Sequence, residues 1–232
     1  HHWNIPGEEQ ALQGADEITS GNNVRHRADH RGHTVDLKNK AGKHNRRQKS
    51  GVQGDLNVGG ITGSMAIDFD FDPEDAIASN GQTSFSFSYK IRDIIDSCTN
   101  SGEITAKKNY CGGIVGRQEM GVVRNSTENG KVTSSSGSYA GGIAGYSVSA
   151  IRKCVSKVTI TGSDYVGGIA GYSDSSIRRS YAKCTLEGGN YVGGIAGWGH
   201  DIKDSVSMLE VTKADEYIGS VAGDVDENGE LS

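Results

Sequence analysis

The chain has 232 residues, of which 34 are glycine and only two are proline, and its formal net charge is −5. Glycine makes up about 15% of the chain, where about 7% is ordinary usage. Each glycine in a helix interior costs about 1 kcal/mol relative to alanine, so this composition argues against a helical bundle or a helix-rich enzyme. No apolar run approaches the roughly 18 residues of a membrane-spanning helix, and we expect no membrane insertion within these residues.

The first fifty residues (1–50) differ in character from the rest of the chain. The stretch 24–49 holds nine Lys or Arg and two Asp, a local net charge of +7, so the remainder carries −12. With few apolar residues to bury, 1–50 is expected to form an N-terminal cap or a basic surface arm. Three histidines here, His26, His30 and His33, have a spacing that could share one helical face. The flanking Lys and Arg side chains repel a cation, so we favour a solvated basic arm over a metal site.

A glycine-rich motif recurs along the chain at a nearly constant period. Its five clear copies are separated by 29, 26, 26 and 26 residues. A sixth copy, NVGGITG, lies at 57–63, and the unlike stretch that follows it predicts an insertion at 64–89. The five copies are YCGGIVG (110–116), YAGGIAG (139–145), YVGGIAG (165–171), YVGGIAG (191–197) and YIGSVAG (217–223).

Short runs rich in Val, Ile and Thr separate the glycine-rich copies, and they are typical of strands of three to six residues. A repeat of about 26 residues with two or three such strands and no helical period describes one coil of a β-solenoid. A propeller blade would need about 40 residues, and a leucine-rich repeat would need a ladder of leucines. We therefore predict an all-β fold, a right-handed parallel β-solenoid (β-helix), over residues 51–232.

Equivalent positions of successive coils should stack at about 4.8 Å in such a fold. One predicted column holds the tyrosines that open the copies, Tyr139, Tyr165, Tyr191 and Tyr217. The four cysteines fall at positions that are small or apolar in the other coils, and Cys98 and Cys154 would lie two coils apart, beyond the reach of a disulfide. We therefore expect four buried thiols, in preference to zinc ligands or disulfides: Cys98, Cys111, Cys154 and Cys184.

The element Y-x-G-G-I-A-G, followed by an Ile-containing strand and a closing V-T-x-T-G or T-L-E-G-G, resembles the glug-motif repeats of bacterial cell-surface proteins. Such repeats also occur outside the catalytic domain of zinc-dependent immunoglobulin A peptidases. The resemblance covers about 110–223 well and 51–63 weakly. It implies a secreted or wall-attached bacterial protein and a domain with no catalytic residues of its own.

Motifs for catalysis or for ions are weak in this sequence. No His is followed by Glu, as a zinc peptidase helix requires, and nucleophile elbows and phosphate-binding loops are missing. The run 66–79 sets three aspartates at a spacing that could serve calcium, although Asp72 could instead cap a short helix, which we favour: Asp68, Asp70 and Asp72. The end of the chain copies the first half of a calcium loop, where we favour a hairpin turn: Asp224, Asp226, Asn228 and Gly229.

Two outward-facing ladders are the candidate functional features. The first is basic and follows a column of inward Ile or Val by one residue: Arg124, Arg152, Arg178 and Lys203. Such stacked cations need acidic neighbours, for which Asp174 and Asp204 are the candidates, or a bound polyanion. The second is aromatic and could contact sugar rings, although stacking of the rings on one another is the favoured interpretation: Tyr146, Tyr172 and Trp198.

These patterns together predict a non-catalytic repeat module of a secreted bacterial surface protein, acting as a spacer or adhesion scaffold with no cofactor. Its expected partners are an acidic glycan, a cell-wall polymer or a host surface protein, and the net charge of −5 argues against general affinity for nucleic acid. The alternative is a substrate-recognition or accessory domain of a secreted peptidase or polysaccharide-acting enzyme. A polysaccharide lyase is less favoured, because no outward acidic cluster accompanies the basic ladder.

Overall fold

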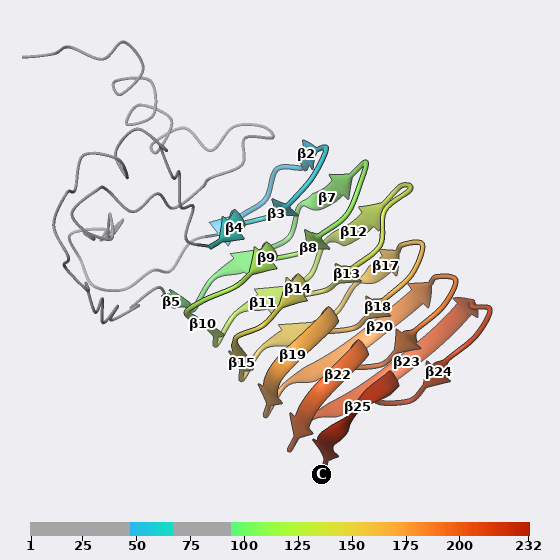
Figure 1. The fold of residues 1–232 in the computed structure, drawn as a ribbon. Coiled ribbons are helices and arrows are strands. Elements are labelled where there is room, and N and C mark those ends of the chain that lie inside the picture. The colour runs from blue at the N-terminus through green and yellow to red at the C-terminus, as the bar shows by residue number, and fades with distance from the viewer. Residues whose placement is uncertain (1–46, 67–93) are drawn as a thin grey trace, which may run out of the picture.

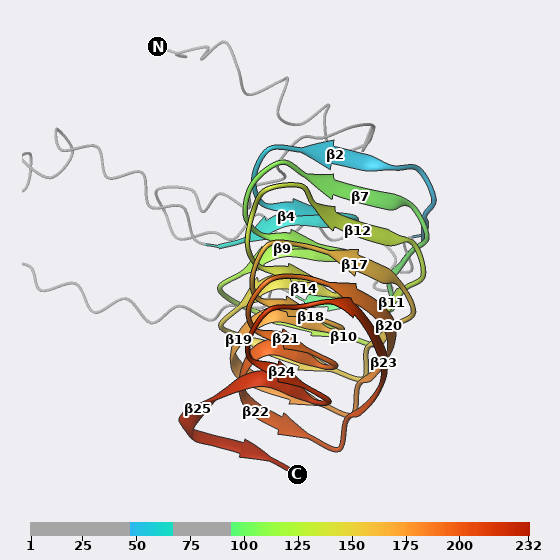
Figure 2. The ribbon, with the colours of Figure 1, turned by 90° about the vertical axis from the view of Figure 1, so that its right-hand side faces the viewer.

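The computed structural model describes residues 47–66 and 94–232, and every regular element in these ranges is a β-strand. The strands form three sheets in which the neighbours pair in parallel. Successive coils lie one above another, as Figures 1 and 2 show from two directions. The all-β parallel solenoid predicted from the repeat is therefore confirmed, and its right-handed sense stays a prediction.

The smallest sheet contains the paired glycines of each repeat and has six short strands. These strands are β3 (Val58–Gly59), β8 (Cys111–Gly112), β13 (Ala140–Gly141), β18 (Val166–Gly167), β21 (Val192–Gly193) and β24 (Ile218–Gly219).

The nine-stranded sheet follows directly in each coil. Early coils contribute two separate strands, and later coils merge them into one. These strands are β4 (Thr62–Met65), β5 (Ile94–Asp96), β9 (Val115–Gln118), β10 (Val122–Arg124), β14 (Ala144–Ser147), β15 (Ala150–Arg152), β19 (Ala170–Arg178), β22 (Ala196–Lys203) and β25 (Ala222–Leu231).

The ten-stranded sheet completes the coil and shows the same merging towards the C-terminus. Its strands are β1 (Arg47–Gln48), β2 (Val52–Gly54), β6 (Thr99–Asn100), β7 (Glu103–Ala106), β11 (Thr127–Glu128), β12 (Lys131–Ser134), β16 (Val155–Ser156), β17 (Thr159–Thr161), β20 (Tyr181–Glu187) and β23 (Val206–Lys213).

The core consists of inward columns of β-branched and small residues. In the column that follows the glycine pair, Ile114, Ile143, Ile169 and Ile195 are fully buried. A second column pairs Val132 with Ile160 and Ile160 with Leu186, all likewise buried. Because each apolar position recurs in every coil, the hydrophobic burial that stabilises one coil is repeated along the axis.

Glycine pairs are required because an added side chain would meet neighbouring backbone at the first glycine and the opposite sheet at the second. A Cβ on Gly112 would lie 2.7 Å from the amide nitrogen of Gly145 in the next coil. A Cβ on the following residue, Gly113, would lie 2.5 Å from Cδ of Glu128 on the opposite sheet. Real Cβ atoms do not approach so closely, so both glycines are needed for the packing of the coil.

The corners of the coil use left-handed backbone without glycine. One corner column consists of Asn57 and the five motif tyrosines, with φ between 53° and 68°. A second corner column has φ between 50° and 57° and contains Ser97, Asn125, Lys153, Arg179 and Asp204. This conformation costs a non-glycine residue about 1 kcal/mol or more. Contacts between coils must therefore offset the cost at every corner.

The tyrosine column supplies such contacts. Ring centroids are 4.9 Å apart between Tyr139 and Tyr165, 4.6 Å between Tyr165 and Tyr191, and 4.5 Å between Tyr191 and Tyr217, with nearly parallel planes. Tyr110 extends the column at 5.2 Å from Tyr139. The predicted stack of tyrosines along the axis is confirmed.

All four cysteines are buried, none in a disulfide, as predicted. Cys111 pairs in register with Val58 and Ala140, and Cys184 pairs with Leu209. Ser126 lies between Cys98 and Cys154 in one column, and its hydroxyl accepts the Cys98 N–H at 3.3 Å. Burial raises the pKa of Cys111 and of Cys154 to about 12.

The proposed domain boundaries stay predictions, since residues 1–46 and 67–93 lie outside the described ranges. Three facts bear on them. Strand β1 lies inside the segment predicted as a cap or arm, and it pairs with β6. Strand β4 extends the first coil through Met65, where it pairs with Gln118 of β9. The chain rejoins the described coils at β5.

Candidate functional site

The basic ladder predicted from the sequence exists as a row of side chains in register. Arg124 pairs with Arg152, Arg152 with Arg178, and Arg178 with Lys203. Each follows a buried Val or Ile on its strand, so alternation turns it outward. The three arginines are exposed and Lys203 is half-buried. Parallel pairing places neighbouring charges on adjacent strands, about 4.8 Å apart along the axis.

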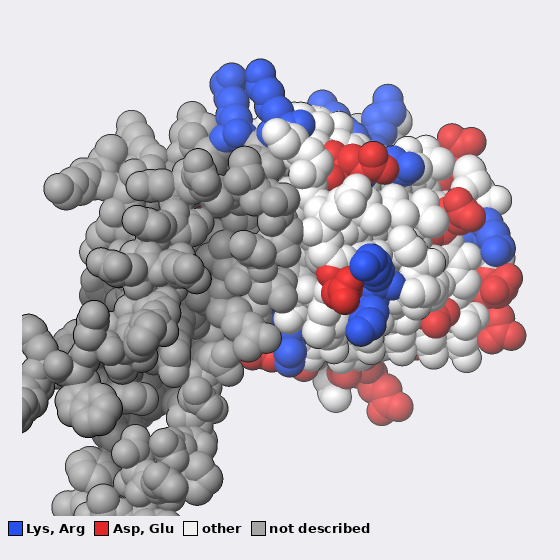
Figure 3. Space-filling model, turned by 90° about the horizontal axis from the view of Figure 1, so that it is seen from above, with Lys and Arg blue, Asp and Glu red and all other residues white. Residues whose placement is uncertain are grey.

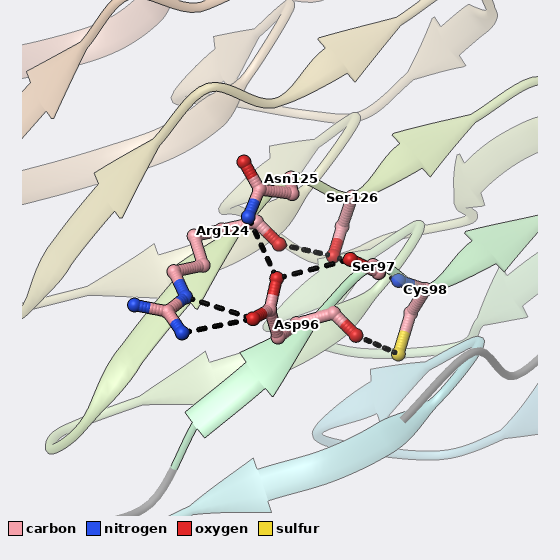
Figure 4. Close-up of polar contacts among 6 residues, drawn as sticks. All are labelled: Asp96, Ser97, Cys98, Arg124, Asn125 and Ser126. Atoms are coloured by element: carbon pink, nitrogen blue, oxygen red, sulfur yellow. Dashed lines mark hydrogen bonds and ion pairs between the residues drawn. The ribbon is translucent and has the colours of Figure 1, made fainter. Parts of the chain in front are cut away.

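A carboxylate neutralises the first member of the ladder. Arg124 donates from Nε and Nη2 to Oδ2 of Asp96, at 3.0 and 2.9 Å, and Asp96 occupies the same ladder position one coil earlier. Asn125 and Ser97 donate to the other oxygen, at 2.7 and 3.1 Å (Figure 4). Burial opposes ionisation of Asp96, but these hydrogen bonds and the Arg124 charge together hold its pKa below the ordinary value.

A second carboxylate neutralises the last member, because Lys203 forms an ion pair with Glu230 of β25. The sequence suggests Asp174 and Asp204 as the acidic neighbours of the ladder, and this expectation is wrong. Asp204 instead pairs with Arg179 at 3.6 Å, and Asp174 forms no ion pair within the described ranges. The carboxylates that neutralise the ladder, Asp96 and Glu230, come from adjacent coils and lie at or beside the ladder position. The spacing of acidic residues along one coil does not reveal such partners.

The two central members of the ladder differ from its ends. Arg152 and Arg178 are both exposed, and neither forms an ion pair with any residue of the described chain. Two unneutralised guanidinium groups on adjacent strands repel each other, and a bound anion would relieve that repulsion. The centre of the ladder is therefore where an anionic ligand gains most.

Sequence reasoning missed four further basic side chains next to these two arginines. Lys153 and Arg179 occupy the left-handed corner directly after the ladder. Lys183 follows on β20, and Lys157 follows between β16 and β17, each one residue beyond the paired Ser156 and Ala182. All are exposed. The signal was present, because each pair is separated by the 26-residue repeat. We call the six residues the basic corner: Arg152, Lys153, Lys157, Arg178, Arg179 and Lys183.

Charge is distributed differently elsewhere on the surface. On the face shown in Figure 3, Lys and Arg side chains are interspersed with Asp and Glu side chains, and uncharged surface separates the groups. Lys131 of β12, for example, pairs with Glu103 of β7 at 3.3 Å, and Lys107 pairs with Asp55 at 3.1 Å. Exposed pairs of this kind contribute little to stability and leave little net field for a ligand.

The second predicted ladder is a structural stack. Tyr146 lies 5.1 Å from Tyr172, and Tyr172 lies 4.4 Å from Trp198, with planes inclined by only 8° and 6°. Arg117 precedes them in register and lies 5.9 Å from the Tyr146 ring. A sugar packs against an open ring face, and the faces of Tyr172 are covered by its neighbours. Self-packing, the favoured interpretation, therefore fits this geometry.

The C-terminal segment does not form the hairpin expected at Asn228–Gly229. Strand β25 pairs in parallel with β22 on both sides of this segment, and the register shifts between Gly199 and Asp201. The extra residues form a bulge in which the Asn228 N–H donates to Asp226 Oδ1 at 2.8 Å. Hairpins join antiparallel strands, so parallel stacking of the coils excludes one here. The histidines of 24–49 and the aspartates of 66–79 lie outside the described residues.

One buried carboxyl was not anticipated. Glu128 of β11 points into the core, where Oε1 accepts the Gly130 N–H at 2.7 Å and Oε2 has no hydrogen-bond partner. Burial raises its pKa to about 8, and the contacts with Gly130 and Asn100 offset only part of that effect. Being fully buried, this carboxyl cannot reach a substrate at the surface.

No protein-family model matches the chain, and no curated protein matches it. A crystal structure from Bacteroides ovatus, described as a "putative immunoglobulin A1 protease", aligns with 76% of this chain at 19% sequence identity and a TM-score of 0.48. The alignment spans 66% of that protein, just under two thirds of its length. The described residues contain no helix that is long and apolar enough to span a membrane.

Proposed function

We propose that this chain is a non-catalytic repeat module of a secreted bacterial surface protein, acting as a spacer or adhesion scaffold that binds acidic polymers. The observation that carries the ligand part is the pair Arg152 and Arg178, two exposed guanidinium groups in register without a carboxylate partner among the described residues. Acidic glycans, cell-wall polymers and acidic host surface proteins are the partners whose charge fits.

The repeated coil supports the scaffold part of this proposal. Each coil adds about 4.8 Å of length and brings its own core column, corner contacts and stacked tyrosine. Such a module extends by adding repeats without redesign of its core, which suits a spacer that holds other parts of a protein away from a surface. The likeness of the repeat to the glug motif belongs to the same proposal, as does a location outside the cell.

The positions of the reactive groups support a role without catalysis. The four thiols and the Glu128 carboxyl lie inside the core, and burial raises the pKa of Cys111 and Cys154, which keeps these thiols protonated. A catalytic nucleophile or base must contact its substrate. The exposed charged groups of the ladder are its three arginines, which suit binding.

Binding of dextran sulfate tests the proposal. The native chain should bind it at low salt and release it as the Debye length falls from about 10 Å at 0.1 M to about 3 Å at 1 M. The double variant Arg152→Ser, Arg178→Ser should lose binding with its melting temperature almost unchanged. The matched control Lys107→Ser, Lys108→Ser removes the same charge from two exposed lysines after β7, at the far end of the ten-stranded sheet, and should bind normally. Equal loss in both variants, or no binding by the native chain, would overturn the ligand part.

Cleavage tests the other half of the proposal. Acidic glycans such as hyaluronan and pectate, incubated with the native chain, should keep their original length by size-exclusion chromatography. If the native chain shortens these glycans and the Arg152→Ser, Arg178→Ser variant does not, the chain is an enzyme and the non-catalytic part of the proposal is overturned.

A further inference from the structure

We propose that the basic corner binds a short oligosaccharide carrying sulfate or phosphate groups, laid around the coil and across two adjacent coils. This inference rests on the proposed function and specifies its ligand. It differs from a ladder that follows the solenoid axis, because it assigns the site a limited length and a different direction.

The limited length follows from the coils on either side. In the preceding coil the three equivalent positions hold Arg124, which Asp96 neutralises, followed by Asn125 and Asn129. The three equivalent positions of the following coil add no net positive charge. They hold Lys203, which Glu230 neutralises, then Asp204, and then the uncharged Met208, which is in register with Lys183. All three columns are thus basic in the same two coils and lose their positive charge beyond them. A periodic ladder would not end in all three columns together.

The direction follows from the dimensions of this patch. Along the solenoid axis it spans one inter-strand step of about 4.8 Å. Around the coil, each row runs from Arg152 through the Lys153 corner to Lys157, five residue steps that extend at most about 18 Å. The long dimension therefore runs around the coil, across the corner between two sheets. A linear anion that contacts all six cations must lie the same way.

The side chains favour sulfate or phosphate as the anion. Arginine presents its N–H groups as a planar fork that binds two oxygens of one tetrahedral group, and the three lysines add point charges. Asp204 is the only carboxylate in the described chain that forms an ion pair with a member of the corner. Six cations within about two Debye lengths act together on a compact, multiply charged ligand.

An apolar edge favours a sugar as the carrier of these groups. Tyr181 points outward on β20 between Arg179 and Lys183, and its hydroxyl donates to Sδ of Met208 at 3.3 Å. Val206, in register with Tyr181, is 57% exposed, and Met208 is 55% exposed. Apolar surface beside a cationic patch fits the C–H faces of a sugar ring whose substituents are anionic.

Length dependence is the deciding experiment. Heparin-derived tetra-, hexa- and dodecasaccharides are titrated calorimetrically into the native chain. We expect one site per chain, and an affinity that stops rising by the hexasaccharide. Affinity that keeps rising in proportion to length, with several chains bound per dodecasaccharide and no tetrasaccharide binding, would overturn the inference while leaving the proposed function intact. If the native chain binds neither dextran sulfate nor heparin, both the inference and the ligand part of the proposed function are overturned.

Paired variants locate the ligand on the surface. Lys157→Ser, Lys183→Ser removes a column outside the ladder and should weaken hexasaccharide binding at least about tenfold. Arg124→Ser, Lys203→Ser removes ladder cations that already have carboxylate partners and should weaken it less than twofold. The reverse order of effects would place the ligand along the axis and overturn the inference. Unchanged melting temperatures confirm that both variants are folded.

Carrier chemistry is tested separately. Tyr181→Ser should weaken heparin hexasaccharide binding several-fold while leaving inorganic polyphosphate binding unchanged. An oligonucleotide with the same number of charges should bind more weakly than the hexasaccharide. Equal effects of Tyr181→Ser on both anions, or tighter binding of the oligonucleotide, would overturn the assignment to a sugar.

Discussion

Gly113 packs directly against the side chain of Glu128, and a Cβ at the glycine would lie 2.5 Å from the carboxyl carbon. The same relationship recurs along the axis. A Cβ on Gly142 would lie 2.8 Å from Cβ of Ser156, and one on Gly168 would lie 2.8 Å from Cβ of Ala182. The second glycine of each pair therefore leaves room for the side chain at one inward position of the ten-stranded sheet.

Gly113→Ala should lower the free energy of unfolding by about 3 kcal/mol, because neither the opposite carboxyl nor the adjacent backbone can move without disturbing the next coil. Chemical denaturation checks this. Gly51→Ala is the matched control, since its nearest atom to an added Cβ is a carbonyl oxygen at 3.3 Å. Equal stability of the two variants would refute the packing argument.

Glu128→Gln should stabilise the protein at neutral and alkaline pH. The folded-state pKa of Glu128 is about 8 against an ordinary value of 4.5. The protonated form is thus favoured by folding, and its contribution is complete below pH 4.5 and is lost as the pH rises towards about 8. Stability of the native chain should fall across this window by a few kcal/mol, and glutamine should remove the fall.

The pH dependence of denaturant midpoints measures this effect. Glu103→Gln, at an exposed carboxyl paired with Lys131, serves as the control and should retain the native slope. A Glu128→Gln profile parallel to that of the native chain would show that Glu128 ionises normally when folded.

The four thiols should react slowly with a thiol reagent until the chain unfolds. The thiolate is the reactive form, and burial that raises the pKa of Cys111 and Cys154 to about 12 suppresses it. Mass spectrometry after timed labelling provides the measurement. Thr159→Cys places a thiol at an exposed strand position and should add one rapidly labelled site. Rapid labelling of all four native thiols, or a mass with two disulfides, would contradict the burial.

Tyr165 should be more tolerant of glycine than of alanine. Both substitutions remove its stacking with Tyr139 and Tyr191, but glycine adopts φ of 54° without the steric penalty of a Cβ. We expect Tyr165→Gly to be more stable than Tyr165→Ala by about 1 kcal/mol, with both below the native chain. At the strand position Thr159 the order should reverse, because glycine is the weaker strand residue there. Thermal melting of the glycine and alanine variants at Tyr165 and at Thr159 measures the order of stability at each position.

Residues that contact their own equivalents in the next coil could be predicted from the repeat. The tyrosine column, the outward basic ladder and the burial of Cys111 between Val58 and Ala140 all follow from this rule. Contacts across the coil could not be predicted in this way. The pairing of Glu128 with Gly113 depends on where the corners bend, and the left-handed tyrosines that form one corner carry no glycine to mark it.

The sequence by itself therefore determined the parallel solenoid, its coil length and the occupants of each column, because a fixed period in a stacked fold converts sequence distance directly into spatial distance. Only the tertiary structure decided that Asp96 and Glu230 neutralise the ends of the ladder, and that Lys157 and Lys183 lie around the corner from Arg152 and Arg178. Those relationships depend on the path of the chain around one coil, and the angle of each corner is set by packing between sheets.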